Sequence, residues 1–283
     1  MIEVRYRDRL GNNLFQYALG RILAEEKGYA LQARPIHGFP NTRKPVPGAV
    51  HDEPQQILQM QHIDFAGLLA DKNPRRIILH GWFQRGEYYW PYRDRIREWF
   101  APDPSIHAPL LKPDLVVHVR RTDYILHGWA LPFSYYEEAI ERLIPPGGTV
   151  CILTDDPTDP FFRQFERWKP HFCEGDALQQ FWLMCQAPRL VISQSTFSWW
   201  PAFLAESQTT ICPAPTFGCW RTGSDNSGIE LVDRDRFLCI DCTEPYTRTE
   251  SDSWRALRLR RLKRKLSLTW NRAFHPGKVA PPP

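Results

Sequence analysis

The sequence predicts an α/β fold made of two domains, and two observations favour this class. In the second half of the chain, short apolar runs alternate with helical patterns, which is typical of βαβ units around a parallel sheet. Between the halves, residues 101–113 contain four prolines and suit a linker. At 283 residues, the chain is long enough for two domains with separate cores. We therefore expect domains at 1–112 and 113–247, followed by a basic helical tail at 248–283.

The first domain is expected to open with a short strand and a long helix. The strand is predicted at IEVRY, followed by a turn at Gly11 and a helix that the glycine at position 28 ends. Apolar side chains cover a wide arc of this helix, so it should pack between layers. Residues 35–56 are predicted to be irregular, RRIILHGWF to be a strand, and EYYWPYRDRIREWF to be a helix that Pro91 interrupts.

The second domain is expected to alternate between strands and helices. Each apolar run is short, and each segment that follows it has helical spacing. The predicted strands are LVVHV, TVCILT, RLVIS and TTICP, and the predicted helices are SYYEEAIERL, FFRQFERW, ALQQFWLMCQ and the segment that contains Trp199 and Trp200.

Charge is unevenly distributed along the chain. The whole sequence has a formal net charge of +4. Residues 255–283 contain nine Lys or Arg and no Asp or Glu, which leaves five net negative charges on the remainder. A body that binds nucleic acid is expected to be basic, so we expect no nucleic acid as a partner.

The basic segment has the pattern of an amphipathic helix at 254–272. Leu259, Leu262 and Leu266 follow spacings of three and four, with Lys and Arg between them. Such a helix can lie on an anionic membrane surface or pack back on the body. No stretch reaches the roughly 18 apolar residues of a membrane span, and no signal-peptide core follows the first residues. We expect a cytoplasmic protein that the tail can hold at the inner face of the membrane.

The seven cysteines are scattered through apolar runs. Their odd number fits reduced core residues better than a disulfide framework. Four of them could offer thiolates to zinc, but their spacings are irregular, so the interpretation that we favour contains no metal. These four are Cys212, Cys219, Cys239 and Cys242.

Polar side chains directly follow the apolar run at 115–119. The segment LVVHVRRTDY ends this predicted strand with a histidine, two adjacent arginines and an aspartate. Open α/β folds bind ligands outside the carboxyl edge of the sheet. The polar cluster is therefore expected at a ligand site.

Five sequence motifs are spread over about residues 4–220. They are RLGNNLFQYA, HGWFQRGEYY, HVRRTDY, LPFSYYEEAI and SQSTFSWWPAFLAE. In this order and at these intervals, they resemble the α-1,2-fucosyltransferase family, and HVRRTD also matches the related α-1,6-fucosyltransferases. The resemblance implies a GT-B-like fold, in which two Rossmann-like domains face a cleft. It also implies GDP-fucose as the donor, inversion at the anomeric carbon, and no cofactor or metal.

The resemblance implies that HVRRTDY binds the donor. Side chains alternate along a strand, so His118 and Arg120 should share one side. Arg121 and Asp123 should share the other, unless the chain turns immediately. Arg120 is expected to bind the diphosphate and to neutralise the leaving GDP, because guanidinium matches phosphate oxygens and stays charged. Arg121 can reach the same phosphate, or it can brace Asp123 and the domain interface. His118 can contact the donor or be a core histidine.

Two further strand ends are expected to complete the donor site. In ILTDDP, Asp155 and Asp156 could accept hydrogen bonds from guanine, with a helix cap before a proline as the alternative. After RLVIS, a helix should start near Ser198, because Pro201 is tolerated only in a first helical turn. Its N-terminal end would bind phosphate, or simply be capped by serine. The donor residues expected here are Ser195, Thr196, Phe197 and Ser198.

The acceptor is expected to bind near the start of the first domain. Gly11 allows a tight turn there, and the amides of Asn12, Asn13 and Gln16 can donate toward the cleft. A plain helix start that asparagine caps is the alternative.

An inverting transfer to a hydroxyl needs a base, unless departure of GDP runs ahead of the attack. Asp123 is the carboxylate nearest in sequence to Arg120, and we treat these two residues as the catalytic pair. His127 and Glu87 are alternative bases.

These expectations add up to transfer of fucose from GDP-fucose to a galactose hydroxyl, in α-1,2 linkage, on a surface glycan. The acceptor would be a galactose-containing glycan, such as a lipid-linked one. The alternatives are a GT-B fucosyltransferase of another linkage or acceptor, and a non-catalytic protein that binds GDP-sugars or glycans. The second alternative rests on Arg9, Asn13 and Pro201, where this chain departs from the family pattern.

Overall fold

The computed structural model describes residues 1–59, 62–106, 111–206, 208–214, 220, 229 and 236–242. The chain forms two compact units. The first comprises Met1–His107, Ser195–Glu206 and Cys219–Arg234, and the second comprises Ala108–Gln194, Ser207–Gly218 and Asp235–Pro283. The chain therefore enters the first unit a second time after Gln194. The domain boundaries given above stay a prediction, and the helix predicted at 254–272 lies outside the described residues.

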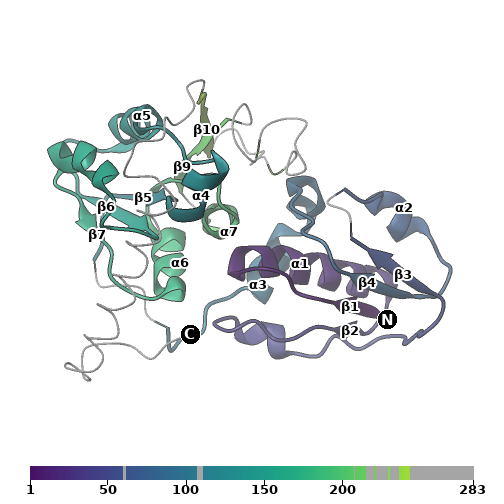
Figure 1. Cartoon of the computed structure of the whole chain (residues 1–283). Helices are drawn as coiled ribbons and strands as arrows, with labels where there is room; N and C mark the ends of the chain where they lie inside the picture. The colour runs from purple at the N-terminus through teal and green to yellow at the C-terminus, as the bar shows by residue number, and fades with distance from the viewer. Residues whose placement is uncertain are drawn as a thin grey trace, which may run out of the picture. The chain divides into compact units, whose positions relative to one another are not determined.

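The first unit is built on a four-stranded parallel sheet (Figure 1). Its strands are β1 (Ile2–Val4), β2 (Leu31–Gln32), β3 (Gln55–Leu58) and β4 (Arg76–Leu79), in the order β2-β1-β4-β3. The sequence predicts the two central strands but not β2 and β3. Both of these are short edge strands without a continuous apolar run, so the usual signal is missing.

Helix α1 (Leu10–Lys27) packs against this sheet. It ends as predicted, because Gly28 adopts φ 65° and its N–H donates to carbonyl oxygens of the last turn. It starts earlier than predicted, with Arg9 as an N-cap that has extended backbone and no side-chain cap. Gly11 therefore lies inside the first helical turn, and the predicted turn there is wrong, as is the alternative of an asparagine cap.

Short helices complete the first unit. Asp64 caps helix α2 (Phe65–Ala70), because its carboxylate accepts a hydrogen bond from the N–H of Gly67. The predicted aromatic helix is interrupted at Pro91, as expected, so that only its second part is α-helical, as α3 (Arg93–Trp99). The 3-10 helices are η1 (Pro40–Arg43), η2 (Gly86–Tyr88) and η3 (Trp90–Tyr92).

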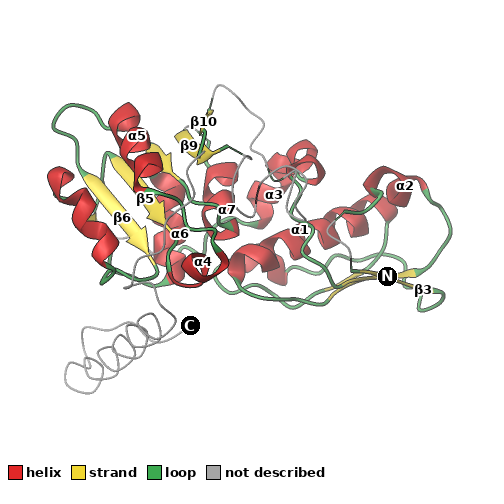
Figure 2. Cartoon of the chain, turned by 45° about the horizontal axis from the view of Figure 1, so that its top comes forward, coloured by secondary structure: helices red, strands yellow, loops and turns green. Residues whose placement is uncertain are grey.

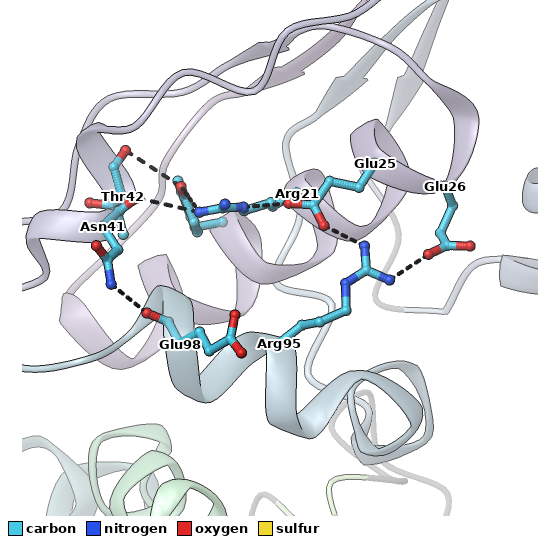
Figure 3. Close-up of polar contacts among 8 residues, drawn as sticks. Arg21, Glu25, Glu26, Asn41, Thr42, Arg95 and Glu98 are labelled. Carbon is cyan, nitrogen blue, oxygen red and sulfur yellow. Dashed lines mark hydrogen bonds and ion pairs between the residues drawn. The ribbon is translucent and has the colours of Figure 1, made fainter.

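A polar network joins α1 to α3 (Figure 3). Arg95 of α3 donates to the carboxylates of Glu25 and Glu26 on α1, with 2.7 Å between Arg95 Nη1 and Glu26 Oε1. Arg21 donates to Glu25 at 2.7 Å from within α1. Because these side chains are partly exposed, the network orients the two helices more than it stabilises them.

The second unit contains a six-stranded parallel sheet. Four of its strands lie where the sequence predicts them: β5 (Leu115–Val119), β6 (Val150–Thr154), β8 (Arg189–Val191) and β9 (Thr209–Pro213). The others, β7 (His171–Phe172) and β10 (Phe237–Ile240), are edge strands, and the order is β10-β9-β8-β5-β6-β7. Parallel pairing buries β5 on both faces, which explains its uninterrupted apolar run.

Helices cover both faces of this second sheet, and Figure 1 shows α5 and α6 on opposite sides. Crossovers between parallel strands are right-handed, so the direction in which the chain moves across the sheet decides which face a connection covers. The chain moves one way from β5 through β6 to β7 and the other way from β7 to β8, so these connections lie on opposite faces. The predicted segment FFRQFERW is a 3-10 helix rather than an α-helix. The bounds are α4 (Thr122–His127), α5 (Phe133–Leu143), η4 (Pro160–Trp168) and α6 (Ala177–Gln186).

Helix α7 (Thr196–Leu204) belongs to the first unit, where it packs against α1 and α3. The ring centre of Phe15 lies 4.7 Å from the ring centres of both Trp199 and Trp200, so these tryptophans are core residues. The helix starts at Thr196, so Pro201 lies inside it and the predicted start near Ser198 is wrong. Burial of the aromatic face outweighs the backbone hydrogen bond that Pro201 removes.

In the part of the chain that the structure describes, none of the helices is long and apolar enough to cross a membrane. Figure 2 shows the same elements by type, with strands β5 and β6 beside helices α5 and α6.

Candidate functional site

The second sheet has a switch point between β5 and β8. The chain continues from β5 to β6 on one side and from β8 to β9 on the other. Open parallel sheets bind ligands outside the carboxyl ends of the strands at such a point. Residues 120–124 follow β5 and residues 192–194 follow β8. The HVRRTDY segment therefore lies at the sheet edge where a ligand site was predicted.

The backbone turns as soon as β5 ends. Arg121 has φ −119° and ψ −92° and precedes the first residue of α4. This helix brings Asp123 back to Arg120, whose Nη2 donates to Asp123 Oδ1 at 2.5 Å. The chain therefore turns immediately after Val119, which is the exception stated for strand alternation, and Asp123 lies beside Arg120.

Arg120 is held by two carboxylates and an aromatic ring. Its Nη1 lies 2.9 Å from Asp155 Oδ2, in addition to the contact with Asp123. Its Cζ lies 5.4 Å from the centre of the Tyr124 ring. A diphosphate would compete with these carboxylates for the same N–H donors. Asp123 is the more exposed of the two, at 39% against 19% for Asp155.

Arg121 is a buried structural residue. Its side chain is 1% exposed, and its Nε donates to Asp159 Oδ2 at 2.9 Å. Its Cζ lies 4.1 Å from the centre of the Phe161 ring. Asp159 also caps η4 by accepting from the N–H of Phe161 at 3.0 Å. The pair therefore ties the turn after β5 to the start of η4, whereas the predicted contact of Arg121 with phosphate stays a prediction.

His118 lies in the buried middle of the sheet. Its Nδ1 is 2.9 Å from Ser193 Oγ, which follows β8. Burial, and to a smaller extent the positive charge of Arg120, lowers the pKa of His118 to about 3. The imidazole is therefore neutral at physiological pH. It links the two strands at the switch point, and its contact with a donor stays a prediction.

The two aspartates after β6 have different surroundings. Asp155 accepts hydrogen bonds from the N–H of Arg121 at 2.9 Å and from the hydroxyl of Thr122, besides its ion pair with Arg120. Asp156 is buried and accepts from the hydroxyl of Thr158 at 2.7 Å. Asp155 thus holds the arginine turn, and the recognition of guanine by either carboxylate stays a prediction.

Tyr124 is a site residue that the sequence analysis missed. Its hydroxyl donates to the carbonyl oxygen of Gln194 at 2.8 Å, while its ring faces the guanidinium of Arg120. It therefore couples the segment after β5 to the segment after β8. The sequence carried no signal for this contact, because it depends on the turn between Arg120 and the start of α4.

In the first unit, the predicted residues at the start of α7 meet the start of α1. Ser195 is the N-cap of α7, and its side chain accepts from the N–H of Phe197 at 3.3 Å. Ser198 is buried and donates to the carbonyl oxygen of Ser195 at 3.2 Å. Thr196 Oγ1 donates to Asn12 Oδ1 at 3.0 Å. Serine capping is therefore present, and phosphate binding at this end stays a prediction.

The other predicted acceptor residues brace the loop after β1. Asn13 Nδ2 donates to the carbonyl oxygen of Arg7 at 2.8 Å. Gln16 is fully buried; it donates to Gly81 O at 2.9 Å and accepts from Arg7 N–H at 3.1 Å. Gly11 lets α1 approach α7, because a Cβ there would lie 2.5 Å from Thr196 Oγ1. These contacts are structural, and a contact with the acceptor stays a prediction.

The alternative bases also have partners. His127 stacks on Trp129, with 4.7 Å between ring centres, and Glu87 accepts from Arg85 Nε at 2.6 Å. The thiols of Cys212 and Cys239 lie 3.2 Å apart on the paired strands β9 and β10. Among the described residues, no group of three or more His, Cys, Asp or Glu side chains could hold a metal, and Cys219 lies outside them.

Residues 56–218 match the model of the family described as glycosyl transferase family 11. This match spans more than half of the chain, so the protein belongs to glycosyl transferase family 11. The family expected from the five motifs is thereby confirmed.

Two relatives from Escherichia coli and one solved structure give the range of similarity. An alpha-1,2-colitosyltransferase is 28% identical over 270 residues, which cover 76% of this chain and 91% of the relative. The O-antigen biosynthesis glycosyltransferase WbnK is 30% identical over 129 residues, 41% of each chain. The NodZ alpha-1,6-fucosyltransferase soaked with GDP-fucose aligns with a TM-score of 0.43 and 12% identity, over 72% of this chain and 92% of that one.

Proposed function

We propose that this protein is an inverting glycosyltransferase that moves fucose from GDP-fucose to a galactose hydroxyl of a surface glycan, in α-1,2 linkage, with a GT-B arrangement of its two units. Membership of glycosyl transferase family 11 supports the reaction class. The names of the two relatives support an α-1,2 linkage and an O-antigen glycan. The observation that carries the proposal is the turn after β5, where Arg120 is presented at the switch point of a parallel sheet.

In this proposal, Arg120 binds the donor diphosphate. Its guanidinium is already oriented by Asp155 and Tyr124, so little side-chain freedom is lost when phosphate oxygens replace Asp123. The positive charge then neutralises the GDP that leaves. Asp123, once displaced, becomes a carboxylate that can accept the proton of the attacking hydroxyl. The buried Arg121–Asp159 pair keeps the turn in place during this exchange.

The comparison supports one alternative donor, which carries colitose in place of fucose. The relative that covers most of this chain is named as a colitosyltransferase, so a colitosyl donor could replace the fucosyl donor. Both would present a diphosphate to Arg120. Turnover of each GDP-sugar by the purified protein, with NMR assignment of the product linkage, distinguishes the two.

The donor site can be tested by calorimetric titration of GDP, with ADP and UDP as comparison nucleotides. We expect selective binding of GDP, and a loss of on the order of 2 kcal/mol in the Arg120→Ala variant, because a charged contact is removed. Arg142→Ala is a matched control, since Arg142 lies on the exposed surface of α5 in an ion pair with Glu138. Equal binding of the three nucleotides, or unchanged affinity in Arg120→Ala, would contradict the proposal.

A non-catalytic GDP-sugar-binding protein would give a different pattern. It would bind GDP selectively but neither transfer nor hydrolyse the sugar. Incubation with GDP-fucose and galactosides, followed by mass spectrometry of the glycan, separates this alternative from the enzyme.

A further inference from the structure

The first unit presents an exposed tryptophan at its sheet edge. Trp82 is 36% exposed, and it is the one tryptophan among the exposed large apolar side chains of the described chain. Its neighbour Phe83, by contrast, is fully buried. An exposed indole offers a flat apolar face with a polar N–H at its edge, so this residue is a candidate for ligand binding.

Trp82 lies where two loops leave the sheet side by side. It follows β4, and β4 pairs in parallel with β1, in the register Val4↔Leu79. Residues 5–9 after β1 and residues 80–84 after β4 therefore emerge at the same carboxyl edge. In open parallel sheets this is the edge that carries ligands.

Three polar side chains surround the indole. Its Nε1–H donates to Asp8 Oδ2, and the same carboxylate oxygen accepts from Asn12 Nδ2 at 3.2 Å. The guanidinium of Arg7 lies over the ring, with its Cζ 4.7 Å from the ring centre. The ring is thus fixed by its N–H and covered on one face by a cation, and it remains 36% exposed.

Further hydrogen bonds from the protein interior hold this patch in position. Asn12 Oδ1 accepts from Gln84 Nε2 at 2.8 Å and from Thr196 Oγ1 at 3.0 Å. Gln84 is itself buried. Such preorganised support is typical of binding residues and reduces the entropy lost when a ligand is bound.

Backbone strain is concentrated in the same two loops. Asp8 and Phe83 have φ values of 62° and 54°, and only one other non-glycine residue of the described chain has a positive φ. A bulky residue such as phenylalanine rarely adopts this conformation. Strained residues of this kind persist where the surrounding structure requires a particular loop shape, often at functional sites.

We propose that Trp82, Asp8 and Arg7 form the subsite that binds a neutral hexopyranose of the acceptor glycan. The C–H face of the sugar would pack on the exposed indole, which supplies contact area at low entropic cost. Hydroxyl groups both donate and accept hydrogen bonds, and Asp8 and Arg7 offer one partner of each kind. The charges of Asp8 and Arg7 offset each other, so this pair does not select a charged ligand, and a neutral sugar is the occupant that fits. The assignment of this sugar to the acceptor rests on the proposed function.

Saturation-transfer NMR with methyl β-D-galactopyranoside and lactose tests this subsite on the full chain. We expect wild-type protein to saturate the sugar protons, and Trp82→Ala to reduce the signal at least fivefold. Trp82→Phe should retain most of it, because a phenyl ring still offers a face. Asp8→Asn should weaken it less than Trp82→Ala, because the amide oxygen can still accept. Phe172→Ala is the control, since Phe172 is also an exposed aromatic, at 39%, but lies on β7 of the second unit.

GDP titrations of the same variants separate this inference from the proposed function. Unchanged GDP affinity in Trp82→Ala, together with loss of the sugar signal, supports the subsite. An unchanged sugar signal in Trp82→Ala, or no signal in a wild-type protein that binds GDP, would overturn it while the donor proposal stands. Sugar binding that depends on Trp82 in a protein that fails to bind GDP would leave the subsite intact and refute the proposed donor.

Discussion

Two neighbouring arginines show how strongly the surroundings of a side chain can differ between adjacent positions. Arg120 and Arg121 are adjacent and chemically identical, yet the first reaches the sheet edge and the second is 1% exposed. The difference arises because the backbone turns between them, which alternation along a strand does not anticipate. Arg120 is therefore the arginine that we propose for the donor site, whereas Arg121 stabilises the turn that presents it.

The Arg121–Asp159 pair should be costly to break from one side. We expect Arg121→Met to lower the free energy of unfolding by about 3–5 kcal/mol, because it leaves the Asp159 carboxylate buried without its cation. Urea denaturation measures this loss. The double variant Arg121→Met/Asp159→Asn should recover most of it, since no buried charge remains and the asparagine can still cap η4. A double variant no more stable than the single one would show that the pair matters for another reason.

His118 should make stability depend on pH. Its pKa is lowered to about 3 in the folded protein, against 6.5 for an ordinary histidine. Below pH 6.5 the unfolded chain takes up a proton that the folded chain does not bind, so the free energy of unfolding falls as pH falls from 6.5 toward 3. The largest contribution is about 1.4 kcal/mol per pH unit.

The His118→Gln variant should lose this component of the pH dependence, as measured by urea denaturation between pH 4 and 7. His127→Gln is the control, because His127 is exposed at the end of α4. The same slope in His118→Gln and in wild type would mean that other groups cause the acid destabilisation.

Among the elements, α7 shows why local rules fail when packing is strong. Pro201 inside a helix predicts a helix break, but the two tryptophans that precede it are fully buried against α1. Short edge strands such as β2 and β7 are missed for a different reason, because two residues are too few to show an alternation of apolar and polar side chains. By contrast, β5 and α5 are predictable from their apolar residues. Strand β5 is buried on both faces and forms a continuous apolar run, and α5 is buried on one face and shows helical spacing.

The contact between α1 and α7 depends on the absence of a side chain at position 11. A Cβ on Gly11 would lie 2.5 Å from Thr196 Oγ1 and 2.7 Å from the backbone nitrogen of Phe197. We expect Gly11→Ala to destabilise the protein by about 1–3 kcal/mol. Alanine usually stabilises a helix relative to glycine, so the sign of the effect is decisive. Thermal denaturation of the Gly11→Ala variant measures the effect, and a stabilised Gly11→Ala would contradict the packing.

For the candidate site, the sequence predicted that Arg120 lies at a sheet edge, but it predicted neither the turn after Arg120 nor the contacts that hold this turn. The motif HVRRTDY placed Arg120 at a sheet edge, because strand ends are readable from apolar runs. The pairing of Arg121 with Asp159 could not be predicted, since 38 residues separate the partners. Trp82 lay within a quoted motif, yet nothing in the sequence distinguishes an exposed tryptophan from a buried one.

For the whole molecule, the distribution of charge predicts a membrane contact. The segment 255–283 carries nine Lys or Arg and no acidic residue. We expect the full chain to sediment with vesicles that contain phosphatidylserine, and deletion of residues 255–283 to abolish this binding, because each basic residue near an anionic surface contributes about 1 kcal/mol. Neutral vesicles are the control. Equal sedimentation of the shortened chain would exclude the tail as the membrane contact.

Helix α7 also has a consequence for synthesis on the ribosome. The sheet of the first unit is complete by residue 79, but Phe15 and Tyr89 pack against Trp199 and Trp200, more than a hundred residues later. At roughly 5–20 residues per second, the nascent chain waits on the order of 5–20 s after its linker before these aromatics are covered. A gene cut at the linker should therefore yield an aggregating N-terminal fragment, and holdase chaperones should engage this protein before its translation ends.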